Sequence, residues 1–468
     1  MVSIPPKCAG LVAAMLLGGA AAHADFRAIL SHYKAGDYEA AHAGFLSLAE
    51  LGDCASQFNL GSMALQGQGG PQDRGTGVGW VEAAEQNGCQ SLVDGRLPAL
   101  KAQLTEPERR SAASIIERYG REALRRQQVV DLNFAPCAEL TPPHVVEAAA
   151  GAYPSGNHRE LLGGLVITEF TIGVDGFARD PRVLLSQPTP QFAAAAIEAW
   201  LNSRFTAATY RGAPMELRVQ LQNTTASPSK GTAGGTPLQG VREAAEAGDS
   251  VAAYTLALAA PFDASLSLYA AKSNQLLVGT ARDGNPQAQY LVWSRLQAVA
   301  ACRAGAAGAA WLMHAADGGE AAAQLALASE LAAPGASAAQ LAQARALLEL
   351  AASSDDYYVR KHVAALLAAS PFAELRDPAT ARTLATGLAA GAIQADPQMF
   401  EVIAAARAAA GDFRGALTQQ RLALSKAYAL GWSTQAMEEH LAAYRSGVPW
   451  RGDLFGYPAA LHAQVTRQ

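Results

Sequence analysis

One kind of turn recurs along this chain at nearly constant spacing. Its glycines fall in two series, Gly52 and Gly88, then Gly248, Gly284 and Gly319, with spacings of 36, 36 and 35 residues. Each glycine has a polar neighbour and is followed by an Ala-rich segment with helical spacing. A period of about 35 residues is typical of stacked helical hairpins, each of which buries its apolar face only against its neighbours. The repeat therefore predicts a mainly α-helical chain built from hairpins.

Within the first repeat, each residue type has an expected place. Gly52 is expected to end one helix in the left-handed conformation, and Asp53 to cap the next helix. Gly61 is expected to let the partner helix approach closely, because it has no side chain. Further along, residues 105–130 are expected to form one helix, since Thr105 and Glu108 are spaced as a capping box.

The composition agrees with packed helices and excludes two classes of protein. Half of the 468 residues are hydrophobic and only 16% are charged, which excludes a chain that is disordered throughout. The length predicts several domains rather than one core. The formal net charge is -5 and the Lys and Arg residues form no cluster, so we expect no nucleic-acid partner.

The repeats resemble known families of helical hairpins. The segments "GDYEAA", "AELGDCASQFNLGSMALQGQG", "PQD" and "WVEAAEQNG", between Gly36 and Gly88, resemble the Sel-one-like repeat family. Near the end of the chain, "DPQMFEVIAAARAAAGDFRGALTQQRLALSKA" resembles a tetratricopeptide unit. The resemblance implies a solenoid that recruits proteins or peptides on its concave face and carries out no chemistry of its own.

A different pattern begins near Tyr153. Val166, Phe170 and Ile172 belong to a run with strand alternation, and Asp175-Gly176 predicts a hairpin between this run and the next. A helical segment follows, and then a third strand over Met215 to Gln222. The order β-β-α-β predicts a small antiparallel sheet covered on one face by a helix.

This region resembles the C-terminal domain of the TonB family over roughly residues 142–223. The motifs that match, in the family's order, are Tyr153-Pro154, Gly164, Phe170-Thr171, Val174-Asp175-Gly176, Ser186, Ala195-Ala196-Ile197-Glu198-Ala199, Arg204-Phe205 and Gly212-Ala213-Pro214. The resemblance implies a periplasmic domain whose edge strand pairs with an extended peptide of an outer-membrane receptor. Unlike a TonB transducer, this chain has no Pro-rich spacer and carries the domain in mid-chain, so the resemblance implies binding without force transmission.

The third strand of this region is the candidate edge for such pairing. The candidate partner-binding residues are Arg204, Arg211, Leu217, Arg218, Val219 and Leu221. The arginines are candidates because they suit an acidic peptide or a carboxylate. The alternatives are that the strand only completes a folded module and that the arginines are solvated surface residues.

The N-terminus has the pattern of a secretory signal peptide. Lys7 precedes an apolar stretch of fifteen residues, Cys8 to Ala22, and the small residues Ala22 and Ala24 predict cleavage before Asp25. The alternative is an uncleaved membrane anchor, although the apolar stretch is shorter than the roughly 20 residues that a span needs. We expect an exported, periplasmic protein with no membrane span after cleavage.

Because the chain is expected to be exported, its cysteines are candidates for disulfide bonds. The chain after the signal holds Cys54, Cys89, Cys137 and Cys302, an even number in an oxidising compartment. Cys54 and Cys89 occupy matching places in successive repeats and are the candidate disulfide. Two states stay open at this point, a disulfide and free buried thiols.

The sequence shows no motif for catalysis or metal binding. The histidines are scattered without metal-ligand spacing, and neither HExxH nor GxSxG occurs. The glycine-rich stretch "GTGVG" at 75–79 follows no predicted strand, so it is not expected to bind phosphate. We expect a protein that is not an enzyme and has no cofactor and no metal, while an enzyme with a site assembled between domains stays the third class of function.

Together these patterns predict a multidomain, mainly α protein in which helical-hairpin solenoid segments flank a small α+β domain. The expected boundaries are a signal peptide at 1–24, a Sel-one-like repeat at 25–100, a connecting helix at 101–130, a TonB C-terminal-like domain at 131–223, a flexible linker at 224–237, Sel-one-like repeats at 238–370, and a tetratricopeptide-like region with a C-terminal cap at 371–468. The linker is expected to leave the C-terminal solenoid free in its orientation. The expected function is an exported periplasmic scaffold that binds a peptide or protein partner, such as an outer-membrane or envelope protein. The alternative is a TonB-type component of outer-membrane transport, anchored by an uncleaved N-terminus.

Overall fold

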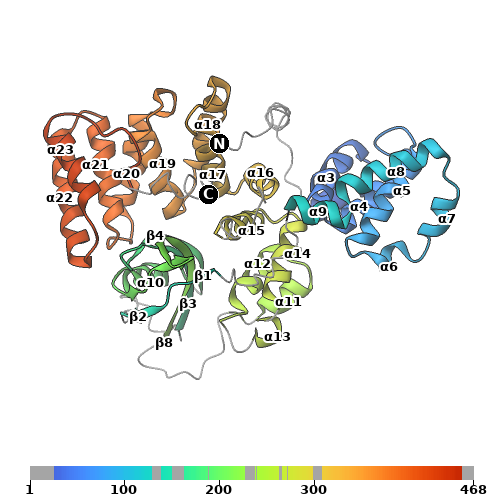
Figure 1. Cartoon of the computed structure of the whole chain (residues 1–468), viewed down its shortest axis with the longest axis horizontal. Helices are drawn as coiled ribbons and strands as arrows, with labels where there is room; N and C mark the ends of the chain where they lie inside the picture. The colour runs from blue at the N-terminus through green and yellow to red at the C-terminus, as the bar shows by residue number, and fades with distance from the viewer. Residues whose placement is uncertain are drawn as a thin grey trace.

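The computed structural model describes residues 26–128, 139–149, 163–187, 189–226, 238, 240–262, 266–270, 272–298 and 308–455. The described chain is mostly helical, with one small strand-containing region between two helical regions, as the sequence predicts. Figure 1 shows the strands in green inside an arc formed by the helices from α11 to α23, and helices α3 to α9 as a lobe beside α14. The predicted signal peptide, Cys137 and Cys302 lie outside the described residues. None of the described helices is long and apolar enough to cross a membrane.

The N-terminal lobe consists of α2 (Phe26–Lys34), α3 (Tyr38–Glu50), α4 (Cys54–Gln66), α5 (Arg74–Gln86), α6 (Gln90–Val93), α7 (Leu97–Ala102), α8 (Glu106–Tyr119) and α9 (Arg121–Gln128). The turn before α4 has the predicted form. Gly52 has a left-handed φ of 89°, and the Asp53 carboxylate accepts a hydrogen bond from the N–H of Ser56. Helices α4 and α5 approach closely at Gly61, where a Cβ atom would lie 2.7 Å from Val81 Cγ2.

The prediction of one connecting helix over residues 105–130 is wrong in its extent. The predicted capping box of Thr105 and Glu108 does begin α8. However, Gly120 has an extended backbone with ψ of 163° and separates α8 from α9. Helix α8 also packs against α5, since a Cβ atom at Gly75 would lie 2.6 Å from the carbonyl oxygen of Glu108. It is therefore part of the N-terminal lobe rather than a connector.

Cys54 and Cys89 form a disulfide in this lobe. Their Cα atoms are 5.6 Å apart, within the range that a disulfide spans. Cys54 begins α4 and Cys89 follows the turn at the end of α5. Of the two states that the sequence leaves open for this pair, the structure has the disulfide.

The helices of the arc are α11 (Val241–Glu246), α12 (Ser250–Ala259), α13 (Ser267–Ala270), α14 (Ser273–Arg282), α15 (Pro286–Ala298), α16 (Ala309–Asp317), α17 (Ala321–Leu331), α18 (Ala338–Ala351), α19 (Tyr357–Ala369), the short η3 (Ala373–Leu375), α20 (Pro378–Ala390), α21 (Pro397–Ala409), α22 (Phe413–Leu430) and α23 (Gln435–Arg445). A buried hydrogen bond recurs between successive helices. The side-chain amides of Gln57, Gln289 and Gln324 each donate to a carbonyl oxygen eight residues earlier, at 3.0, 3.0 and 3.2 Å. This shared bond shows that hairpins of the lobe and of the arc are built on one plan.

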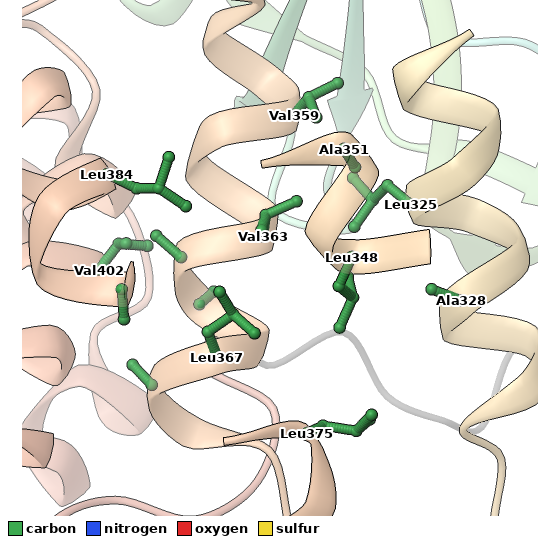
Figure 2. Close-up of a cluster of buried hydrophobic side chains, with 14 of the residues drawn as sticks. Leu325, Ala328, Leu348, Ala351, Val359, Val363, Leu367, Leu375, Leu384 and Val402 are labelled. Atoms are coloured by element: carbon green, nitrogen blue, oxygen red, sulfur yellow. The ribbon is translucent and has the colours of Figure 1, made fainter. Parts of the chain in front are cut away.

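The core of the arc is formed by small and branched aliphatic side chains. Figure 2 shows Leu325 of α17, Leu348 of α18 and Val363 of α19 directed into one layer, with Leu384 of α20 and Val402 of α21 on the other side of α19. Leu348 and Val363 are completely buried. Each helix thus buries its apolar face between two neighbours, which is the arrangement that the repeat period predicts.

The strand region contains β1 (Leu140–Thr141), β2 (Val145–Glu147), β3 (Gly163–Ile172), β4 (Ala178–Gln187), α10 (Gln191–Leu201), β5 (Arg204–Phe205), β6 (Ala208–Tyr210), β7 (Ala213–Met215) and β8 (Leu217–Ala226). The long elements β3, β4, α10 and β8 have the predicted β-β-α-β order. They form a three-stranded antiparallel sheet, called the sheet below, with the order β4-β3-β8. Its register pairs Ile172 with Leu217 and Gly163 with Ala226.

Two predictions about the linker after the sheet are wrong. Strand β8 continues to Ala226, so it includes the start of the predicted linker at 224–237, while residues 227–237 lie outside the described residues. The arc is also not free of the sheet, because Leu165 and Ile167 share a hydrophobic core with Leu256 of α12. The composition of a linker predicts only that the connecting residues themselves are flexible. The orientation of the arc relative to the sheet is fixed by the apolar surface that the two bury against each other.

The C-terminal segment turns back onto the arc after α23. Gly447, in the region 371–468 for which a C-terminal cap is predicted, has a left-handed φ of 69°. The N–H of Gly452 then donates to the carbonyl oxygen of Ala369, at 2.8 Å, at the end of α19. The segment therefore covers the end of an earlier hairpin.

Candidate partner-binding site

The faces of the sheet are covered by two different sets of helices. Phe170 and Ile172 of β3 are completely buried against Ile197 of α10 and Leu424 of α22. On the opposite face, Leu165 and Ile167 pack against the first helices of the arc. Because both faces are covered, a partner can reach the sheet only along an edge.

Charged side chains gather where the second face of the sheet meets the middle of the arc. We call this cluster the buried ion network, and its members are Glu169, Asp180, Arg182, Arg218, Glu320, Lys361, His362 and Asp396. Strands β3, β4 and β8 supply four members, and the helices or helix caps of α17, α19 and α21 supply the other four. Four carboxylates thus face three permanent cations and one histidine.

Lys361 is the centre of one half of the network. Its Nζ lies 3.0 Å from Asp180 Oδ1 and 2.9 Å from Asp396 Oδ2, and the side chains of all three residues are at most 4% exposed. The same Nζ donates to Gln398 Oε1 at 3.0 Å, and Tyr357 Oη donates to Asp396 at 2.9 Å. The donors and acceptors around this buried ammonium group are therefore matched, as burial of a charge requires.

Two arginines form the other half. Arg182 Nη2 lies 3.0 Å from Glu320 Oε1, and Arg218 Nε lies 3.4 Å from Glu169 Oε2. Arg182 Nη1 is 3.7 Å from Glu169, which is an ion pair without a hydrogen bond. Arg218 also reaches Asp180 through Nη1 at 3.1 Å and so joins the two halves.

The network favours the charged state of Asp180 and of Lys361. Burial opposes the ionisation of Asp180, but His362, Lys361 and Arg218 together hold its pKa well below the usual range. Burial also opposes the charge on Lys361, yet Asp396 and Asp180 raise its pKa. A charge left without its partner here would be costly, so the network fixes the sheet to the arc in one position.

The outer edge of β8 is the candidate edge for pairing among the residues that the structure describes. Strand β8 is the last strand in the order β4-β3-β8, and within the described chain no strand pairs with its other side. Residues 218–223 of β8 are partly exposed. The opposite edge strand, β4, is packed against α19. Among the described residues, β8 is therefore the edge that can accept another strand.

A cavity of about 330 Å³ lies beside this edge, and we call it the edge cavity. Its wall includes Glu169 of β3, Arg218 and Gln220 of β8, Leu258 and Phe262 at the end of α12, Asn274 of α14 and Arg295 of α15. The volume is within the range of pockets that hold ligands. Strand and arc thus form the two walls of one candidate binding surface.

The predicted partner-binding residues of β8 occupy both sides of the strand. Leu217 is buried, and Val219 and Leu221 pack against the core shared with α10 and α22. Their alternation is as predicted, but their side chains stabilise the fold, so only their backbone lies along the edge. Arg218 points to the opposite side, where it belongs to the buried ion network and also lines the edge cavity.

The other two predicted arginines lie away from the edge cavity. The guanidinium of Arg204 stacks on the ring of Phe177 at 4.2 Å. Arg211 is exposed and pairs with Glu139 at 3.1 Å. The structure therefore does not bring the three predicted arginines together into one site.

The sequence patterns missed the residues of the arc that contact the sheet. Lys361 had a detectable signal, because it occupies the apolar stripe of α19 together with Ala364, Ala365 and Ala368. A lysine in such a stripe predicts a buried partner. Arg295 had no comparable signal, because its relation to β8 depends on how the arc folds around the sheet.

Within the residues that the structure places, no group of three or more His, Cys, Asp or Glu side chains is arranged to hold a metal ion. The carboxylates of the buried ion network face cations of the chain itself. Their contacts are those of a structural ion-pair network.

Comparison with known proteins identifies the middle of the chain. A family model described as the Gram-negative bacterial TonB protein C-terminal matches residues 150–224, which include β3, β4, α10 and most of β8. No curated protein and no solved structure matched the chain. The assignment of the helical hairpins to the Sel-one-like or tetratricopeptide family stays a prediction, because the family match covers only the central segment. Residues 150–224 are thus similar to the C-terminal domain of TonB proteins, and this similarity supports a role in protein interactions of the Gram-negative envelope.

Proposed function

We propose that this chain is an exported periplasmic scaffold that binds an extended peptide of an envelope protein along the outer edge of β8. The observation that carries the proposal is that β8 ends the sheet, with no further strand paired to it in the described chain, within a segment similar to the TonB C-terminal domain. An extended peptide adds to such an edge through main-chain hydrogen bonds. We also propose that the chain binds without catalysing a reaction.

The sheet occupies the inner face of the arc, and this is why we place the partner at the edge of β8. The helical repeats resemble families that bind partners on a concave face, but here the inner face of the arc holds the chain's own sheet (Figure 1). The buried ion network and two hydrophobic cores fix that contact. An external partner therefore uses β8 and the edge cavity rather than the inner face of the repeats.

The disulfide of the N-terminal lobe supports the proposed location. Disulfides persist in the periplasm and are rare in the cytosol. Cys54 and Cys89 are paired in the structure. Together with the signal-like N-terminus, which lies outside the described residues, this supports export.

Photo-crosslinking in intact cells tests the proposed function. A photoreactive amino acid replaces Gln222 on β8, and a matched variant carries it at Thr386, an exposed residue of α20. We expect discrete crosslinks to an envelope protein from position 222 and none from position 386. Equal crosslinking from both positions, or none from position 222, would contradict binding at this edge.

The similarity to TonB supports a second candidate function, a TonB-type transport component retained in the membrane by its N-terminus. The first residue of the native protein discriminates between the two functions. A protein that begins at Asp25 supports the scaffold. A protein that begins at Met1 or Val2 and is recovered with membranes supports the transport component.

A further inference from the structure

Arg295, on the wall of the edge cavity, makes its direct hydrogen bonds to neutral groups rather than to a carboxylate. Arg295 Nη1 donates to Asn274 Oδ1 at 2.8 Å, and its Nη2 donates to Gln220 Oε1 at 3.0 Å. Both acceptors are neutral amides. Among the residues that the structure describes, no carboxylate lies within 4 Å of this guanidinium, although an arginine is always charged in a protein.

The contrast with the neighbouring arginines is informative. Arg182 and Arg218 lie on the same side of the sheet, and each has carboxylates within 4 Å. Glu169 also lines the edge cavity, and its charge favours the charged form of Arg295, but it lies beyond 4 Å from that guanidinium and is shared between these two arginines. The enclosed cations therefore contact carboxylates directly, whereas the direct contacts of Arg295 are amide oxygens and Glu169 acts on it only from a greater distance.

The position of Arg295 fits a ligand that lies along β8. Its guanidinium is tied to Gln220 on the strand, so it stands at the point where α15 meets the edge. Two of its five N–H groups are used in the bonds described, and the planar fork of an arginine matches a carboxylate. Burial disfavours its charged form and lowers its pKa, so an arriving anion would relieve an existing cost.

The opposite wall of the cavity adds an apolar surface. Leu258 is buried, and Phe262 is 37% exposed where α12 ends. A strand that pairs with β8 presents alternate side chains on this side. The cavity thus offers a cationic group and an aromatic ring to neighbouring positions of one extended segment.

We propose that Arg295 is a specificity residue that binds a carboxylate of the peptide paired with β8. The arc then does more than hold the sheet, because its helix α15 selects which peptides are accepted. This inference rests on the proposed function of β8. The carboxylate has two sources, an acidic side chain within the segment or the free C-terminus of a peptide.

Fluorescently labelled peptides distinguish these sources. Three peptides share an alternating Thr-Val sequence: one has a central Glu and an amidated C-terminus, one has a central Gln and an amidated C-terminus, and one has a central Gln and a free C-terminus. Binding to the full chain lacking the predicted signal is measured by fluorescence anisotropy. The variants are Arg295→Gln, Arg295→Lys and the control Arg211→Gln, which removes an exposed arginine outside the cavity wall.

We expect one of the two carboxylate peptides to bind about tenfold to a hundredfold more tightly than the neutral peptide, which is the range for a hydrogen bond to a charged group. Arg295→Gln should abolish this preference and leave binding of the neutral peptide unchanged, Arg295→Lys should retain part of the preference, and Arg211→Gln should retain all of it. Equal binding of all three peptides would overturn the role of Arg295 and leave pairing at β8 intact. Failure of all three to bind would count against the proposed function and, with it, this inference. Thermal unfolding of each variant shows whether it is folded.

Discussion

Lys361 on α19 and Asp180 on β4 form an ion pair of 3.0 Å between the arc and the sheet, and both side chains are almost completely excluded from solvent. Asp180 has a left-handed backbone with φ of 54°, a conformation that Asp tolerates better than most residues. His362 Nε2 lies 2.6 Å from the same carboxylate. The sheet is therefore held by charges that are largely excluded from water.

We expect Lys361→Met to destabilise the protein strongly. The substitution would leave Asp180 and Asp396 buried and close to each other without the ammonium group between them. Breaking a buried ion pair by removing one partner costs about 3–5 kcal/mol of the free energy of unfolding. Urea unfolding measures the loss, and Lys101→Met, which removes an exposed pair with Glu82, should change it by no more than about 1 kcal/mol. Similar effects of the two substitutions would show that the network contributes little.

Acidification should weaken the contact between the N-terminal lobe and the arc. His314 Nδ1 of α16 lies 3.1 Å from Ser47 Oγ of α3, and burial lowers the pKa of His314 to about 4 from its ordinary value of 6.5. Between these values the unfolded chain binds more protons than the folded chain, so stability falls as the pH is lowered from 7 towards 4. This site alone should lose roughly 2 kcal/mol by pH 5.

The matched variant for this pH effect is His314→Gln, which keeps a polar group but does not titrate. The difference in unfolding free energy between pH 7 and pH 5 should be smaller in this variant than in the wild type. An unchanged difference would mean that other groups cause the loss.

Reduction of the disulfide should destabilise the N-terminal lobe. Cys54 and Cys89 are 35 residues apart in sequence, and cross-linking a loop of this size is worth about 4 kcal/mol through the entropy of the unfolded chain. Calorimetry with and without a reductant measures this contribution. A variant with both cysteines replaced by Ser should unfold at the same lower temperature in either buffer, and a large response to the reductant in that variant would point to a different disulfide.

Gly164→Ala should disturb the contact between β3 and α10. A Cβ atom at Gly164 would lie 2.5 Å from the ring of Phe192, which is itself buried. Overpacking of this kind costs about 1–3 kcal/mol. The control is Gly279→Ala in α14, where a Cβ atom would meet nothing within 4 Å, so helix propensity should make it neutral or stabilising by up to about 1 kcal/mol. Thermal unfolding compares the two, and equal effects would show that β3 and α10 can separate without cost.

The sequence predicts the turns and strands whose conformation is determined by residues close together in the chain. The turn at Gly52 and Asp53 and the alternation of Leu217, Val219 and Leu221 are properties of short segments, and both are present in the structure. The docking of the sheet into the arc could not be predicted in this way. The contact between Asp180 and His362 joins residues 182 positions apart, and no local pattern specifies such a pair.

The placement of the sheet inside the arc also sets an order of events during biosynthesis. The ribosome completes β8 before it makes any helix of the arc, so Leu165, Ile167 and the charges around Asp180 exist for a time without their contacts from the arc. The last hydrophobic contribution, from α22 and α23, arrives only when the chain is nearly finished. A nascent or truncated chain that ends before these helices therefore carries an unfinished apolar surface, which makes it a substrate for chaperones and proteases.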